Sequence, residues 1–174
     1  MENICPSFSF ATINNTYTFG PLAKSHDTLE YVNTSNKRIY DLIRGEMRGG
    51  FEPTKPVFTF VDVRDVALAH VRAMTVPEAA GKRFYVIGGF FTNHRISGII
   101  RRQFGMKFYD SLPPLADELG QDDFPTVFWG YDNSRSIEVL RLDYADLEKS
   151  VTDTVNSIVA LDEELRKQSW CPML

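Results

Sequence analysis

The switch from strand to helix between residues 58 and 74 constrains the fold of this chain more than any other feature. Residues 57–61 form an apolar run of strand length, rich in β-branched and aromatic side chains. The apolar residues that follow take helical spacing and are predicted to share one face: Val66, Ala69, Ala73 and Met74. Asp62 and Asp65 lie at the switch, where a helix N-terminus favours a carboxylate. The pattern predicts a strand that leads directly into an amphipathic helix.

Similar signals recur along the chain. Strands are also predicted over residues 7–13 and 83–87, the second ended by Gly88-Gly89. Further helices are predicted over residues 37–47, 93–104, 134–140 and 146–167, and loops over residues 24–36 and 111–124. Ser35 or Asn36 is the predicted cap of the helix over residues 37–47, which would turn Ile39, Leu42 and Ile43 inward.

Strands that alternate with helices predict an α/β fold with parallel pairing. The sheet is expected to be partial, because the strand over residues 7–13 has no earlier strand in this chain with which to pair. Residues 1–174 are therefore interpreted as a single partial domain. An unpaired strand edge is a template for association, so a partner chain that completes the sheet is one hypothesis.

Composition and charge exclude several classes of function. The net charge of −4 gives no electrostatic support for a nucleic-acid partner, and the basic residues Arg101, Arg102 and Lys107 are interpreted as a solvated helix end. No apolar run approaches the roughly 18–20 residues that span a bilayer. With two cysteines and no visible secretory signal, a soluble cytoplasmic protein is expected.

Several ordered segments resemble one known family. These segments are Pro6-Ser-Phe-Ser-Phe-Ala-Thr-Ile-Asn14, Phe19-Gly-Pro21, Val61-Asp-Val-Arg-Asp-Val-Ala-Leu-Ala-His70, Ala80-Gly-Lys-Arg-Phe-Tyr-Val-Ile-Gly-Gly89, Tyr131-Asp-Asn-Ser-Arg-Ser-Ile-Glu-Val-Leu140 and Leu147-Glu-Lys-Ser-Val-Thr-Asp-Thr154. Together they resemble the C-terminal half of extended and atypical short-chain dehydrogenases/reductases, close to the ketone and aldehyde reductases related to dihydroflavonol and cinnamoyl-CoA reductases.

The resemblance implies a partial Rossmann-like parallel sheet with a small substrate-binding lobe around residues 37–47. It also implies NADP as cofactor and a small carbonyl compound as substrate, as in secondary metabolism. The family loop before Phe19-Gly-Pro21 contacts the nicotinamide carboxamide, so the cofactor-binding candidates are Asn15, Thr16, Tyr17 and Thr18. Asn15 and Thr16 stand where the family usually has two prolines, and the loss of two fixed φ angles is expected to loosen the loop.

The sequence lacks the motifs that the family's reaction needs. No glycine-rich strand-to-helix turn is present to hold a pyrophosphate, and no Tyr-x-x-x-Lys is present to donate a proton. Tyr144 comes nearest, with Lys149 one residue too far along. No catalytic residue is therefore predicted.

Other chemistry is not predicted either. The three histidines, His26, His70 and His94, are too dispersed for a short metal motif, and a structural role is expected for His70. Asp122 and Asp123 are interpreted as a solvated loop pair rather than an acid/base dyad.

Two hypotheses of function remain. The first is an NAD(P)H-dependent reductase-family protein that is inactive alone, because the cofactor and proton-transfer motifs are missing. The second is a non-catalytic remnant or accessory module that pairs with another chain. The sequence leaves open the substrate, the choice between NADP and NAD, the oligomeric state, and whether a mis-assigned start removed the front half. Reading the genomic DNA upstream of Met1 would separate that last case from a true truncation.

Overall fold

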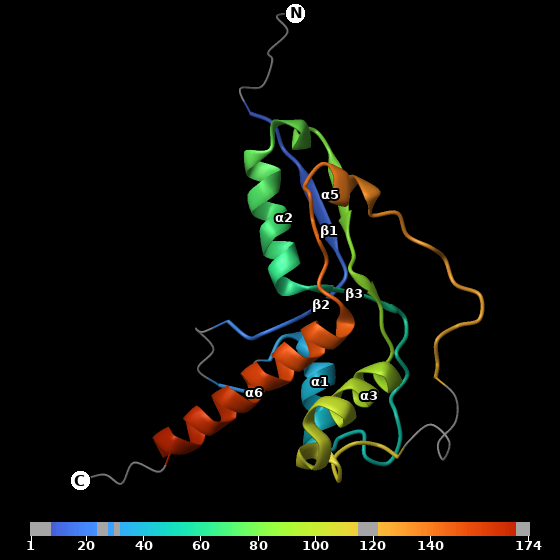
Figure 1. Cartoon of the computed structure of the whole chain (residues 1–174), viewed down its shortest axis with the longest axis vertical. Helices are drawn as coiled ribbons and strands as arrows, with labels where there is room; N and C mark the ends of the chain where they lie inside the picture. Colours follow the sequence, from blue (N-terminus) through green and yellow to red (C-terminus); the bar gives the residue numbers. More distant parts are fainter. Residues whose placement is uncertain (1–7, 24–27, 30–31, 115–121, 170–174) are drawn as a thin grey trace, which may run out of the picture.

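The strands form two short sheets that lie against each other at their ends. The computed structural model describes residues 8–23, 28–29, 32–114 and 122–169 (Figure 1). One sheet pairs β1 (Thr12–Asn15) in parallel with β4 (Arg83–Val86). The other has the order β2-β3-β5, with β2 (Tyr17–Phe19) parallel to β3 (Thr59–Asp62) and β5 (Gly89–Phe90) antiparallel to it. The predicted α/β class with parallel pairing is confirmed.

The helices lie in two groups. Helix α2 (Val63–Thr75) runs along β1 and β4, and the short helices η1 (Pro77–Ala79) and α5 (Ser134–Glu138) lie at the same end of the molecule (Figure 1). At the other end, α1 (Thr34–Arg44), α3 (Asn93–Phe104), η2 (Gly105–Phe108) and α6 (Leu147–Ser169) pack together. None of the helices in the described ranges is long and apolar enough to cross a membrane.

The first strand lies later in the chain than predicted. The alternation over residues 7–13 suggested a strand there, but β1 begins at Thr12 and extends through Asn15, with only Thr16 between it and β2. Pairing explains the shift, because Thr12 to Asn15 are the residues that face β4. Phe8 and Phe10 instead leave 72% and 71% of their surfaces exposed.

Helix α1 begins three residues earlier than predicted, at Thr34, and its N-cap residue is Asn33 rather than Ser35 or Asn36. The predicted inward face is confirmed, because Ile39, Leu42 and Ile43 are buried. The helix ends at Arg44, where Gly45 adopts the left-handed conformation with φ of 87°.

The strand-to-helix switch is the best-predicted feature. β3 lies one to two residues later than expected, all four of its residues are buried, and Asp62 caps α2 by accepting a hydrogen bond from the Arg64 amide (2.9 Å). On α2, Ala69 is buried as predicted, whereas Met74 is 79% exposed. Val66 and Ala73 pack against the smaller core cluster with Ala69, so the prediction that Met74 shares their face was wrong.

The hydrophobic core has two parts. The larger cluster joins α1, α3 and α6 to the rings of Phe19, Phe60 and Phe91. The smaller one joins α2 to β4 and includes Val61 and Phe84. Successive residues of a strand point to opposite faces, so β3 contributes Phe60 to one cluster and Val61 to the other. Strand β3 thereby contributes side chains to both hydrophobic clusters.

The remaining elements agree closely with the sequence pattern. Helix α3 has the predicted bounds, α6 begins one residue later than predicted and ends two later, and α5 falls within the predicted short helix. Strand β5 was missed because two residues carry no periodic signal. The predicted exposed loop over residues 111–124 is partly wrong, because Leu112 is 3% exposed and packs in the larger core cluster; residues 115–121 of that loop lie outside the described residues.

Candidate functional site

The predicted cofactor loop forms the connection between the two sheets. Asn15 ends β1, Thr16 is the linking residue, and Tyr17 and Thr18 begin β2. The Asn15 amide donates to Thr18 Oγ1 (2.9 Å), and Thr16 Oγ1 donates to the Thr59 carbonyl oxygen (2.9 Å). These side-chain hydrogen bonds fix the loop where prolines would otherwise fix φ. The expected loosening of the loop stays a prediction.

Side chains from two helices hold the backbone at the end of the loop and at the turn that follows it. Ser35 of α1 accepts a hydrogen bond from the Thr18 amide (3.1 Å), and the buried Asn36 donates to the Gly20 carbonyl oxygen (2.9 Å). From α6, Thr154 Oγ1 accepts from the Gly20 amide (2.9 Å). Ser35 and Asn36 thus anchor β2 and the turn after it instead of capping α1.

A pocket of about 470 Å³ opens beside the loop. Its lining residues are Asn15, Thr16, Tyr17, Thr34, Ser35, Val57, Thr59, Tyr85 and Trp129. Three of the four predicted residues therefore line one pocket, and the fourth, Thr18, lies behind Asn15 and hydrogen-bonds to it. The pocket lies at the carboxyl ends of β1 and β4, which is where α/β sheets bind ligands.

The lining of this pocket is uncharged and partly aromatic. Amide and hydroxyl groups of Asn15, Thr16, Thr34, Ser35 and Thr59 provide donors and acceptors, and three rings provide flat walls, those of Tyr17, Tyr85 and Trp129. These groups fit the ring and carboxamide of a nicotinamide. The lining offers no cation for a pyrophosphate, so within the described residues the fit covers only the nicotinamide end of a dinucleotide.

The sequence did not indicate Tyr85, Trp129 or Val57 as pocket residues. The position of Tyr85 on a strand, one residue before its end, was a usable signal, because strand ends of this kind carry ligand contacts. Trp129 gave no signal, since it lies in an irregular segment. That segment is held by rings: Phe128 stacks on Trp129 and meets Phe58 edge-on.

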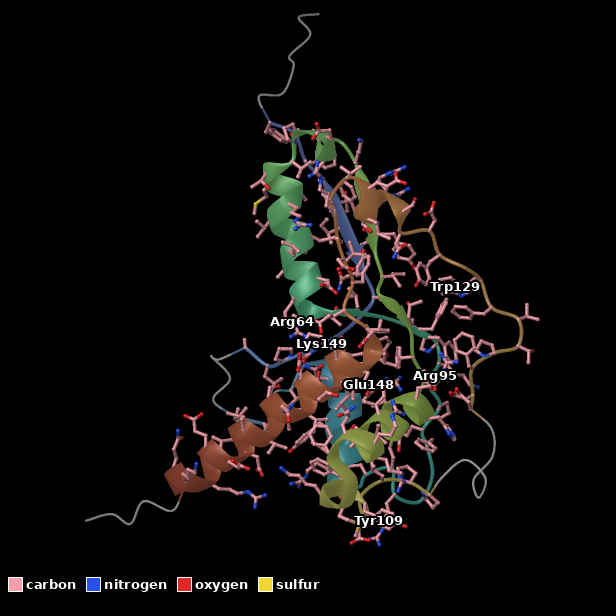
Figure 2. The ribbon with its side chains drawn as sticks, in the orientation of Figure 1. Arg64, Arg95, Tyr109, Trp129, Glu148 and Lys149 are labelled. Atoms are coloured by element: carbon pink, nitrogen blue, oxygen red, sulfur yellow. The ribbon has the colours of Figure 1, made fainter. Side chains whose placement is uncertain are left out.

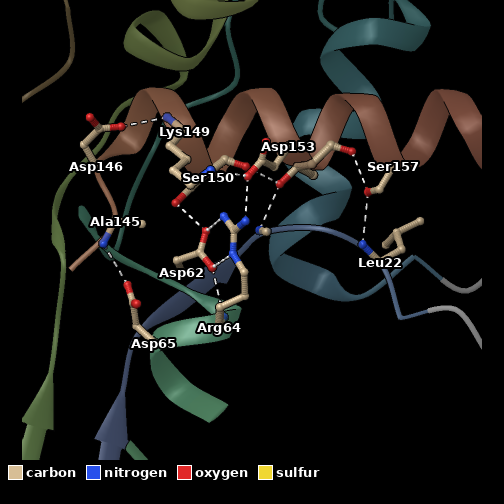
Figure 3. Close-up of polar contacts among 12 residues, drawn as sticks. Leu22, Asp62, Arg64, Asp65, Ala145, Asp146, Lys149, Ser150, Asp153 and Ser157 are labelled. Atoms are coloured by element: carbon tan, nitrogen blue, oxygen red, sulfur yellow. Dashed lines mark hydrogen bonds and ion pairs between the residues drawn. The ribbon is translucent and has the colours of Figure 1, made fainter. Parts of the chain in front are cut away.

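Asp62 links the loop's surroundings to α6 (Figure 3). Its side chain is fully buried and receives hydrogen bonds from Nε and Nη2 of Arg64 (2.8 Å each) and from Ser150 Oγ (2.7 Å). Burial alone would raise the pKa of Asp62, but the hydrogen bonds from Arg64 and Ser150 outweigh it and hold the pKa below its ordinary value. Arg64 extends the network to Asp153 (2.6 Å).

Asp65 is a different kind of carboxylate. It lies in the first turn of α2, is 8% exposed, and among the described residues accepts one hydrogen bond, from the Ala145 amide (3.0 Å). Burial raises the pKa of Asp65, and the nearby negative charge of Asp62 adds to that effect. Figure 3 shows Asp65 pointing away from Arg64, toward the segment that precedes α6.

Two other residues that the sequence analysis considered make local contacts. Tyr144 Oη hydrogen-bonds to Ser136 (2.7 Å), and burial raises its pKa, so it has the features of a structural group. His70 Nδ1 contacts the Val66 carbonyl oxygen of its own helix (2.8 Å), in line with the expected structural role. Across the described ranges, no three His, Cys, Asp or Glu side chains form a group that could hold a metal.

Asp122 and Asp123 are accessible to solvent, as predicted, and each also has a partner in the protein. Asp123 accepts hydrogen bonds from the Thr54 amide (2.6 Å) and hydroxyl (2.8 Å). Asp122 forms an ion pair with Arg95 (3.2 Å), whose guanidinium also lies over the Phe124 ring. The two aspartates tie the segment with Trp129 to the body of the protein; Figure 2 labels Trp129 and Arg95, the partner of Asp122. Sequence alone could not show these contacts, because the partners are 27 or more residues away.

A parallel α/β core with a pocket at its strand ends is the arrangement in which Rossmann-like folds bind their ligands. The comparisons with known proteins agree. Ketoreductase azaE of Aspergillus niger is 40% identical over 163 residues, which cover 91% of this chain and 46% of the relative. A putative NADPH-dependent methylglyoxal reductase, GRP2 of Candida albicans, is 30% identical, with 91% and 46% covered. The crystal structure of Gre2 in complex with NADPH from Candida albicans superposes with a TM-score of 0.73 at 30% identity, over 92% of this chain and 46% of that one.

The chain is similar to these NADPH-dependent reductases, consistent with the C-terminal half of an extended or atypical short-chain dehydrogenase/reductase that its motifs resemble. It spans about half the length of the curated relatives it matches. No family model matches the chain. The predicted family, the Rossmann-like fold and NADP as the family's cofactor are confirmed.

Proposed function

We propose that this chain forms the nicotinamide and substrate side of an NADPH-dependent carbonyl reductase. The observation that carries the proposal is the pocket beside Asn15, Thr16 and Tyr17, which unites three of the four residues expected to face the nicotinamide. Bound NADPH supplies a hydride. The chain's own residues bind and orient the ring: Asn15 and Thr16 provide polar contacts, and Tyr17 and Tyr85 provide flat walls.

The substrate in this proposal is a small ketone or aldehyde, which would lie beside the nicotinamide near Val57 and Trp129. The relatives reduce such carbonyl compounds, and a lining without charged side chains suits an uncharged one. The sequence contains no Tyr-x-x-x-Lys and no glycine-rich turn. We therefore assign the proton donor and the pyrophosphate site to polypeptide outside these 174 residues, which makes residues 1–174 one partial domain.

Binding of the nicotinamide half of the cofactor tests the proposed role of residues 15–18. Reduced nicotinamide mononucleotide lacks the second phosphate and the adenosine, so its binding to the chain should depend on the loop alone. We expect saturable binding by saturation-transfer NMR, about tenfold weaker in Asn15→Ala. Asn156→Ala, an exposed asparagine on α6, is the matched control. Equal binding by both variants would contradict the proposed role of the loop.

A second candidate function is that of a module that pairs with another chain. Strand β1 hydrogen-bonds to β4 on one side, and no strand among the described residues pairs with its other side. Exposed apolar side chains lie nearby: Phe8 and Phe10 just before β1, and Val71 and Met74 on α2. A strand from a partner would satisfy the open backbone groups and cover this surface.

The two candidates differ in what the chain does alone. The pairing module predicts a mass in solution above that of a monomer, or isolation as a hetero-complex. A stable monomer that binds reduced nicotinamide mononucleotide would support the reductase assignment and contradict the pairing module. Oxidation of NADPH with methylglyoxal by the 174-residue chain itself would contradict both the pairing module and the assignment of the proton donor to another segment.

A further inference from the structure

A second pocket lies among the helices, apart from the predicted cofactor loop over residues 15–18. Its volume is about 410 Å³, and its lining residues are Leu29, Tyr40, Ile43, Arg44, Lys107, Phe108, Ile158, Val159, Asp162, Glu163 and Arg166. It is formed by the end of α1, the turn η2 and the middle of α6. It shares no residue with the pocket beside Asn15, and the proposed reductase function does not use it.

The floor of this pocket is apolar and continuous with the core. Ile43 and Ile158 are buried members of the larger core cluster, and Phe108 and Val159 pack against it while remaining partly open. A floor of this kind favours a ligand with an apolar part, since burying apolar surface on binding is favourable.

The mouth of the pocket carries an uneven set of charges. Three cations and two carboxylates line it, and Arg166 forms an ion pair with Asp162 (2.8 Å). Arg44 and Lys107 form no ion pair with any described residue; each lies over a ring instead, Arg44 at 5.9 Å from Tyr40 and Lys107 at 5.8 Å from Phe108. With Arg166 and Asp162 paired, the remaining charged residues of the lining are two cations, Arg44 and Lys107, and one carboxylate, Glu163.

This local excess of positive charge occurs on a chain whose net charge is −4. A ligand that is negative at one end and apolar elsewhere would match both parts of the pocket: its hydrocarbon would cover Ile43, Ile158 and Val159, and its acid group would meet Arg44 and Lys107. A neutral ligand would gain no attraction from Arg44 and Lys107. A dianion would place its second negative charge near the carboxylate of Glu163, which would repel it.

We propose that the pocket between α1, η2 and α6 is a binding site for a small apolar monocarboxylate. A ligand in this pocket would contact both α1 and α6. These two helices hold β2 and the turn after it through Ser35, Asn36 and Thr154. A ligand bound here could therefore stabilise α1 and α6 without entering the pocket beside Asn15.

The probe for the test is 2-naphthoate, with the uncharged isostere 2-naphthamide as its partner. Titration of the isotope-labelled chain by NMR should give saturable shifts at Tyr40, Phe108 and Val159, and no shifts at Thr16 or Tyr17. We expect 2-naphthamide to bind at least tenfold more weakly than 2-naphthoate. Shifts centred on the nicotinamide loop, or equal binding of the two compounds, would overturn the proposal.

Variants separate the site from general attraction between charges. Arg44→Gln with Lys107→Gln should weaken 2-naphthoate binding about tenfold and leave 2-naphthamide binding unchanged. Arg48→Gln, an exposed cation near the end of α1 that does not line the pocket, is the matched control. Val159→Trp should block the floor and abolish binding of both compounds, with a melting curve to show that the variant is folded. Equal losses in the double variant and in Arg48→Gln, or unchanged binding in folded Val159→Trp, would overturn the proposal.

Discussion

Gly20 ends β2 at the point where the chain leaves the sheet beside the cofactor loop. Its φ of 132° lies in a region that L-residues rarely adopt, and an added Cβ would lie 2.6 Å from Val63 Cγ1. Both of its backbone groups are hydrogen-bonded, to Asn36 and Thr154. A glycine is therefore required by conformation, by space and by the fixed position of its neighbours.

Gly20→Ala should lower the free energy of unfolding by about 2–3 kcal/mol through backbone strain and the contact with Val63. Urea denaturation measures this loss. Gly49→Ala is the control, because no atom lies within 4 Å of its added Cβ and its φ is not positive. Similar losses in the two variants would show that the conformation of Gly20 is not the cause.

Asp62 and Asp65 should respond in opposite ways to replacement by asparagine. Asp62→Asn removes the charge that pairs with Arg64 and should cost about 2 kcal/mol, a modest loss for a buried pair because Arg64 is 42% exposed. Asp65→Asn keeps an oxygen to accept from the Ala145 amide and removes a buried charge, so stability at pH 7 should be unchanged or higher. Thermal melting of both variants measures the difference, and equal destabilisation would contradict it.

The pH dependence of these two carboxylates also differs in sign. The folded-state pKa of Asp62 is lowered, so its contribution to stability is complete above its ordinary pKa of 3.8 and is lost as the pH falls through the folded-state value. The folded-state pKa of Asp65 is raised, so its contribution is complete below 3.8 and is lost as the pH rises through the folded-state value. The destabilisation by Asp62→Asn should therefore shrink in acid, which urea denaturation at pH 7 and below pH 3.8 would show.

At the scale of elements, α6 supports the turn after β2 and the end of β3. Its residues Ser150, Thr154 and Ser157 accept from or donate to Asp62, Gly20 and Leu22 (Figure 3). Each of these hydroxyls lies on the face of α6 that meets β2 and β3. The helix thus holds the turn after β2 through polar contacts as well as through packing.

Two threonines on α6 provide a matched test. Thr154→Val removes the acceptor for the buried Gly20 amide and should lower the free energy of unfolding by about 1–3 kcal/mol. Thr152→Val replaces a buried hydroxyl that has no hydrogen-bond partner among the described residues, so it should be neutral or stabilising. Chemical denaturation separates the two. Destabilisation of both variants to the same extent would show that valine in this helix, not the lost hydrogen bond, is responsible.

The sequence predicted most elements because their signals are local. Periodicity located α3 to the residue, and the strand-to-helix switch located Asp62 as a cap. What it missed depended on distant partners: the start of β1 is set by pairing with β4, and Asn36 is drawn from a capping role by the Gly20 carbonyl. For the pocket, resemblance supplied Asn15, Thr16 and Tyr17, while Trp129 entered through aromatic contacts that no local pattern encodes.

At the scale of the whole molecule, the surface around α2 and β1 has the features of a surface that associates with another chain. Val71 and Met74 leave 52% and 79% of their surfaces open on the outer side of α2. Neighbouring exposed apolar groups beside an open strand edge favour contact with another chain.

Val71→Lys with Met74→Lys should therefore lower the self-association of the chain, measured by light scattering across a concentration series. Val127→Lys with Met106→Lys is the control, because Val127 and Met106 are at least as exposed (90% and 81%) but lie away from α2 and β1. Association reduced equally by both pairs would indicate a general effect of added charge rather than this surface.

Strand β3 has Phe60 in one hydrophobic cluster and Val61 in the other, so neither cluster can lose its order without removing a wall of its neighbour. The chain should accordingly melt as one cooperative unit, with the calorimetric and van't Hoff enthalpies in agreement. In hydrogen exchange, the amide protons of the central strand should be among the last to be replaced by deuterium, opening only in global unfolding. Two separate transitions would mean that the cluster around α2 and the cluster around α6 are held together far less firmly than their common strand implies.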